Sequence, residues 1–195
     1  MTVRGQAHTL EGFAAALVVL SGVVFALQAT AVTPLTASTS NQFIGNQQTD
    51  VAEDLLASAE ANETLRPTLL YWNASREAFA DSPREGYFSN GGPPTAFGTA
   101  LNETFDGANV AFNVRVEARA PGGGTDSVRL VYMGTPSDNA ATATRTVTVF
   151  DDARVAGGPD DVSTVAANGN FYARDVDPDG PLFNVMEVHV TVWRI

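Results

Sequence analysis

Apolar and polar residues follow three different patterns along the chain. The first is an apolar run in which the sixteen residues from Gly12 to Leu27 carry no charge, and which extends with few polar interruptions to Val32. At about 1.5 Å per residue, a helix of this length spans a hydrocarbon core of about 30 Å. We therefore expect a short cytoplasmic leader at residues 1–7 and one transmembrane helix over residues 8–33.

The second pattern is an amphipathic stripe. Pro34 cannot donate a backbone hydrogen bond, so the first helix is expected to end or kink there. Spacing of 3.6 residues then predicts a second helix, from about Asn41 to Ala61 within the segment 34–61, with one face buried on a core. The stripe consists of Ile44, Gln48, Val51, Ala52, Leu55, Leu56 and Ala59.

The third pattern begins at Asn109 and has a period of two, which is typical of strands. Four runs within residues 109–195 alternate in this way, near 109–119, 127–133, 142–150 and 185–195. Because each run has one apolar face, we expect a mainly antiparallel sheet with one side covered by the amphipathic helix. The expected fold class of the head, residues 34–195, is α+β, and a β-sandwich head is the alternative.

Residues 62–108 show little periodicity. Prolines and glycines interrupt the segment, yet seven aromatic residues between Tyr71 and Phe105 are too many for a disordered linker. We expect an irregular, aromatic-rich cap with short helical turns at Leu65–Trp72 and Ser75–Ala80. An aromatic platform for glycans is the functional alternative.

The charge composition restricts the partners. The chain has 22 acidic residues, 11 basic residues and no cysteine, for a net charge of −11, and all the basic residues are arginine. Disulfide and thiolate chemistry is therefore excluded, and a nucleic-acid partner is not expected because no basic surface can neutralise phosphates. An acidic chain without lysine is similar to the proteins of salt-loving archaea, in which hydrated carboxylates maintain solubility.

The residues suited to catalysis or metal binding are few. The chain has two histidines, His8 beside the apolar run and His189 on a predicted strand, and no glycine-rich phosphate loop. A catalytic base would have to be His189, which is isolated in the sequence, so we expect no enzyme, no catalytic residue, no cofactor and no metal site.

An acidic turn leaves one metal question open. Asp175, Asp177 and Asp179 match the first half of a calcium loop, but position twelve is Met186 where such a loop requires a glutamate. The sequence does not decide whether these aspartates bind calcium. Three glycosylation sequons begin at Asn62, Asn73 and Asn102, and we expect them to lie in exposed loops outside the sheet.

The N-terminus carries a family resemblance, in the string RGQAHTLEGF at residues 4–13. It resembles the N-terminus of archaeal type IV pilin-like proteins and is similar to a haloarchaeal family of single-span surface proteins, over about the first 45 residues. The resemblance implies cleavage after Arg4-Gly5, so that Gln6 becomes the first residue and the apolar helix is retained. It also implies that Glu11 pairs with the α-amino group of a neighbouring subunit. Stabilisation of an acid at a helix N-terminus is the simpler interpretation of Glu11.

These observations predict a single-pass protein of the cell membrane with an extracellular C-terminal head, because Arg4 places the N-terminus on the cytoplasmic side. The expected partners are membrane lipid and other pilin-like subunits, or copies of itself, through the N-terminal helix. The expected role is a subunit or minor component of a surface filament or of its assembly machinery. Two alternatives remain: a surface adhesion module that does not polymerise, and a secreted module released by cleavage after Ala31.

Overall fold

The computed structural model describes residues 3–105, 109–156 and 158–195, and within them it leaves the side chains of residues 3–8 and 28–46 undescribed. It divides into two compact units, Met1–Ile44 and Gly45–Ile195. The described residues of the first unit are all helical, and the second unit contains the end of the same helix, the remaining helices and all the described strands. Each unit is described by itself below.

Helix α1 is assigned as one continuous helix from Val3 to Ala61. The helix therefore does not end at Pro34, which was one of the two expectations, and a kink there stays a prediction. A proline removes one backbone hydrogen bond and costs about 3 kcal/mol in a helix interior. The bonds on either side remain, and in a helix of 59 residues they maintain the helical backbone through this position.

The C-terminal part of α1 contributes to the core of the second unit. Ala52, Leu55, Leu56 and Ala59 are buried within the same apolar cluster as the strands, which confirms most of the predicted stripe. Val51 is 39% exposed, because it lies about a quarter of a turn from the centre of the buried stripe. Gln48 is half-buried, and the side chain of Ile44 lies outside the described residues.

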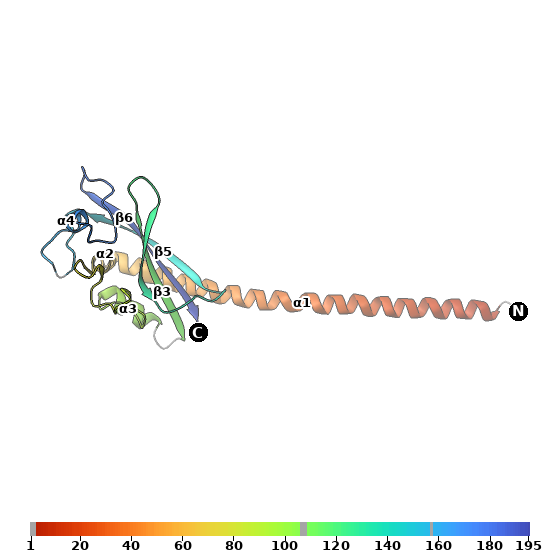
Figure 1. Ribbon diagram of the computed structural model, residues 1–195. Helices are drawn as coiled ribbons and strands as arrows, with labels where there is room; N and C mark the ends of the chain where they lie inside the picture. The colour runs from red at the N-terminus through yellow and green to blue at the C-terminus, as the bar shows by residue number, and fades with distance from the viewer. Residues whose placement is uncertain (1–2, 106–108, 157) are drawn as a thin grey trace. The chain divides into compact units, whose positions relative to one another are not determined.

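Four strands form the main antiparallel sheet, as the alternating pattern predicted. They are β3 (Val110–Arg119), β4 (Thr125–Tyr132), β5 (Ala141–Phe150) and β6 (Leu182–Arg194). The strand order is β4-β3-β6-β5, so that the last strand lies between β3 and β5 (Figure 1). Both pairings of β6 are antiparallel and extend over nine or more residues of the strand.

The two faces of this sheet differ in polarity. One face is apolar and buried, with Val114, Val116, Val188 and Val190 fully enclosed in the cluster that includes the α1 stripe. The opposite face carries charged and hydroxyl side chains. The head is therefore α+β. The described strands form this sheet and a two-stranded ribbon, and not the sandwich that was the alternative.

The segment 62–108 is more regular than its sequence suggested, although its residues 106–108 lie outside the described ones. It contains α2 (Leu65–Leu69), the ribbon of β1 (Trp72–Asn73) and β2 (Ala78–Phe79), and α3 (Ala96–Phe105). A further short helix, α4 (Val162–Ala167), lies between β5 and β6. The expected helical turn at Ser75–Ala80 is wrong, because Asn73 Oδ1 accepts hydrogen bonds from the amides of Ser75 and Arg76 and makes a turn.

Aromatic residues fill the core beneath this segment, as expected. Trp72, Phe79, Phe97 and Phe105 are all buried. Trp72 meets Phe79 edge to face with ring centroids 5.3 Å apart, and its indole nitrogen donates a hydrogen bond to the carbonyl of Asn170 at 2.8 Å. These four rings are enclosed in the core, whereas Tyr71, Tyr87 and Phe88 are half-buried, so a glycan platform would have to use those three rings.

Candidate functional site

The N-terminal apolar segment is the first candidate. Residues Thr9–Leu27 form the one stretch of described helix that is long and apolar enough to cross a membrane, with 19 residues and a mean hydropathy of 2.2. None of it is buried by the protein itself, and Phe13 and Phe25 are 67% and 74% exposed. An apolar surface of this extent is costly in water, and by length and composition the segment is suited to a membrane span or a signal anchor.

The residues implied in processing lie at the beginning of this helix. Arg4, Gly5 and Gln6 belong to the helical backbone of α1, and their side chains lie outside the described residues. Cleavage between Gly5 and Gln6 therefore stays a prediction. Glu11 is exposed on the helix, two residues after the start of the apolar segment at Thr9. Glu11 therefore lies near one end of the segment, and its pairing role stays a prediction.

The three sequons differ in accessibility. Asn62 is exposed directly after α1, and its side-chain amide donates to the carbonyl of Ser58 at 2.9 Å. Asn73 is the last residue of strand β1 and is half-buried. Asn102 lies inside helix α3 rather than in a loop, and its Oδ1 accepts a hydrogen bond from the amide of Gly92 at 2.8 Å. Among the three, Asn62 is the best-exposed position for a sugar.

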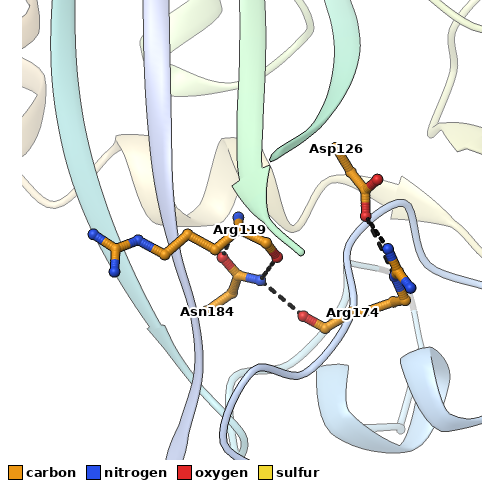
Figure 2. Close-up of polar contacts among 4 residues, drawn as sticks. All are labelled: Arg119, Asp126, Arg174 and Asn184. Carbon is orange, nitrogen blue, oxygen red and sulfur yellow. Dashed lines mark hydrogen bonds and ion pairs between the residues drawn. The ribbon is translucent and has the colours of Figure 1, made fainter. Parts of the chain in front are cut away.

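The acidic loop before β6 is held by a buried asparagine. Asn184 is fully buried, and its side-chain amide donates to the carbonyls of Arg119 and Arg174 at 2.9 and 2.7 Å, while its Oδ1 accepts from the amide of Arg119 at 3.0 Å. Figure 2 shows these bonds, together with the ion pair in which Arg174 contacts Asp126 at 3.0 Å. The end of β3 is thereby connected to the loop that carries Asp175, Asp177 and Asp179.

One aspartate of this loop stabilises a local turn. Asp175 Oδ1 accepts a hydrogen bond from the amide of Asp177 at 2.9 Å, so that one carboxylate oxygen already stabilises the backbone. Asp177 and Asp179 are exposed. Burial, and then the charges of Asp175, Asp177 and Asp152, raise the pKa of Asp151 above its usual value. The carboxylates of the loop therefore disfavour a further negative charge beside them.

His189 has neighbours that the sequence did not reveal. It lies on the polar face of β6, and the side chain is 15% exposed. Its Nδ1 lies 3.1 Å from the hydroxyl oxygen of Thr144 on β5. The carboxylates of Glu117 on β3 and Glu187 on β6 both approach its Nε2. Within the described part of the chain, these three residues are the group whose atoms are arranged to hold a metal ion.

The fold and the N-terminal segment together define an α+β protein with one candidate membrane-spanning helix. The chain belongs to a family of unknown function, DUF7288, whose sequence model matches residues 4–192. The match includes both the apolar helix and the sheet, so the two parts belong to one family. No curated protein and no solved structure matches the chain.

Proposed function

We propose that this chain is a membrane-anchored extracellular protein of pilin-like organisation, acting as a subunit or minor component of a surface filament or of its assembly machinery. The observation that carries the proposal is the exposed apolar segment Thr9–Leu27 on the same helix that supplies the core stripe of the head. A secreted module would discard this segment, whereas an anchor or a filament core uses it.

The energetics of the apolar segment favour its retention in lipid. Burial of apolar side chains contributes about 25 cal/mol per Å² removed from water, and a segment of this length holds a protein in a bilayer almost irreversibly. In a pilin-like filament the same surface is covered by neighbouring helices. Lipid would cover this apolar surface before assembly, and other subunits would cover it after assembly.

Glu11 gives the anchor a polar contact at one end. A carboxylate at the membrane edge costs a few kcal/mol unless it is paired, and an α-amino group released by cleavage before Gln6 is a partner of opposite charge. Such pairing between subunits would fix their register along the filament. The head then remains outside, where its surplus of acidic residues interacts with a salt-rich medium.

The test is incorporation into surface filaments. Glu11→Gln removes the charge and keeps the size of the side chain, so we expect normal membrane insertion but a strong loss of the chain from purified filaments. The matched control is Glu53→Gln, which removes an exposed acid from the head part of the same helix and should leave incorporation unchanged. Equal incorporation of both variants, or wild-type cells without filaments, would remove the assembly role and favour a surface adhesion module.

A further inference from the structure

The polar face of the sheet contains a cluster of three ionisable side chains. Glu117 lies on β3 directly opposite Glu187 on β6, and His189 is two residues further along β6 on the same face. Cross-strand neighbours of this kind have Cβ atoms about 5 Å apart, and the diagonal neighbours lie within side-chain reach. The strand register therefore gathers the three side chains at one point of the face.

The two distances from the histidine nitrogen to the carboxylates are close to those between the ligands of one metal ion. His189 Nε2 lies 3.6 Å from Glu117 Oε2 and 3.6 Å from Glu187 Oε2, and all three ligand atoms lie within 4.8 Å of one another. Ligands about 2.0 to 2.2 Å from a tetrahedral zinc ion are separated from one another by about 3.4 Å. A single ion can thus contact all three with little movement of the side chains.

Neighbouring side chains hold two of these groups in orientation. Thr144 contacts His189 Nδ1 at 3.1 Å, which leaves Nε2 directed toward the carboxylates. Arg115 binds Glu117 through its other oxygen, Oε1, at 3.1 Å, so that Oε2 remains directed toward the histidine. Outer contacts of this kind commonly fix the ring orientation and the carboxylate rotamer at metal sites.

Two features of the cluster are unfavourable in the protein alone. Glutamates directly opposite each other on adjacent strands repel, and this arrangement destabilises a sheet. His189 Nε2 is fully enclosed and has no hydrogen-bond partner among the described residues, because both carboxylates stand beyond hydrogen-bond distance. An enclosed polar atom without a hydrogen bond is unfavourable. A divalent cation at the centre would satisfy the nitrogen and neutralise both carboxylates.

We propose that Glu117, Glu187 and His189 bind one divalent transition-metal cation of the Zn²⁺ type through Oε2, Oε2 and Nε2. An imidazole nitrogen favours such a cation over Ca²⁺ and Mg²⁺, which prefer oxygen ligands alone. Three protein ligands leave a fourth position for water or for a group from outside the chain. Bound at Nε2, the ring carries its proton on Nδ1 and donates it to Thr144.

Titration of the metal-stripped, full-length chain in detergent and molar KCl tests the site, with Zn²⁺ alone as the probe. Isothermal calorimetry should give one ion per chain. Glu117→Gln, Glu187→Gln and His189→Gln each remove a ligand, and each should weaken binding more than 100-fold, beyond the range of about 10- to 100-fold seen for outer contacts. Thr144→Val removes only the contact to Nδ1 and should weaken binding by about 10- to 100-fold.

Two matched controls separate the site from general charge and from the other histidine. Glu85→Gln removes an exposed acid elsewhere in the head, and His8→Gln removes the remaining histidine of the chain. Both should bind Zn²⁺ as the wild type does. With only two histidines, ¹⁵N NMR of the wild type and of His8→Gln assigns the ring of His189 and reports whether Zn²⁺ binds at Nε2.

The outcomes are distinct. Saturable 1:1 binding that is lost in the three ligand variants, with a shift of the His189 Nε2 resonance, supports the site. Undetectable binding, or binding that the ligand variants retain, would overturn it and leave the cluster as a histidine between two carboxylates. If the variants fail to fold, as judged by circular dichroism, the NMR shift in the wild type decides alone.

Discussion

Helix α1 contains two apolar segments that have opposite relations to the rest of the protein. Residues 9–27 are predominantly apolar and remain exposed, whereas the stripe from Ala52 to Ala59 is one-sided and is buried with the sheet. The apolar side chains of the second segment are buried by the chain's own core, and those of the first are not. The same helix therefore has one end packed in the core of the head and one exposed apolar end, and this difference is the physical basis of the proposed function.

The two units also differ strongly in the number of charged side chains. Residues 45–195 carry 21 acidic and 10 arginine side chains, whereas the first 44 residues carry one of each. The Debye length is about 30 Å at 0.01 M salt and about 3 Å at 1 M, so dilution exposes the head to its own repulsion. We expect the strand signal in circular dichroism to be lost at low salt and regained in molar KCl, while the helix signal of residues 9–27 persists in detergent.

A control separates screening from other effects of dilution. An uncharged osmolyte at the same osmolality should not restore the strands, because it does not screen charge. The same strand signal and melting temperature at low and high salt would contradict the view that repulsion limits the stability of the head.

Truncation of one leucine in each segment tests the difference between the two segments directly. Leu56 is 1% exposed and Leu20 is 62% exposed. Leu56→Ala leaves a cavity in the core and should lower the free energy of unfolding of the head by about 2–5 kcal/mol. Leu20→Ala should change it by no more than about 0.5 kcal/mol. Chemical denaturation of both full-length variants in detergent measures the difference, and comparable losses would mean that residue 20 also belongs to the head core.

The head also contains a buried polar side chain, and the prediction for it is smaller. Asn184→Ala removes three hydrogen bonds and leaves the carbonyls of Arg119 and Arg174 without this donor. We expect a loss of about 1–3 kcal/mol. Asn90→Ala, at an exposed position, is the control. If the two variants denature alike, Asn184 does not hold the loop to β3.

The smallest effect concerns Asp151, which follows β5 and whose pKa is affected by the charges of the acidic loop, and it depends on pH. The pKa of Asp151 is raised, so the folded head binds this proton more tightly than the unfolded chain does. Its contribution to stability therefore decreases as pH rises from the usual carboxyl pKa of about 4 through the raised value. Asp151→Asn should stabilise the head slightly at neutral pH and flatten this part of the profile. Melting temperatures of Asp151→Asn and of the control Asp138→Asn, measured across this pH range in molar salt, test the effect. A steeper decrease of the melting temperature with pH in Asp151→Asn than in the wild type would contradict it.

The strands could be predicted from the sequence because a period of two is a local property. Each of the four runs carries its own alternation, and each appears as a strand. Helix α3 could not be foreseen, because Gly98 interrupts its pattern. That glycine is required by the packing, since a Cβ there would collide with the carbonyl oxygen of Pro93. Likewise, the turn at Ser75–Ala80 depends on side-chain bonds from Asn73 that periodicity does not detect.

The cluster on the polar face could be predicted only in part. Glu187 and His189 are two residues apart on a strand, so their common face follows from the sequence. Glu117 lies on another strand, and its position depends on β6 inserting beside β3 in one register. A shift of one residue would turn Glu117 to the other face. That register is set by packing of the whole sheet, so the alternating pattern alone does not contain it.

The most direct measurement of the central claim is the N-terminal residue of the protein in membranes washed with high salt and alkaline carbonate. The account predicts that the chain stays in the pellet, because screening does not release an apolar anchor, and that peptide mass spectrometry finds Gln6 as its first residue. A pellet protein that begins at Met1 would support a plain anchor and contradict pilin-type processing. Recovery mainly from the growth medium, with Val32 as the first residue, would contradict both the anchor and the pilin-like function.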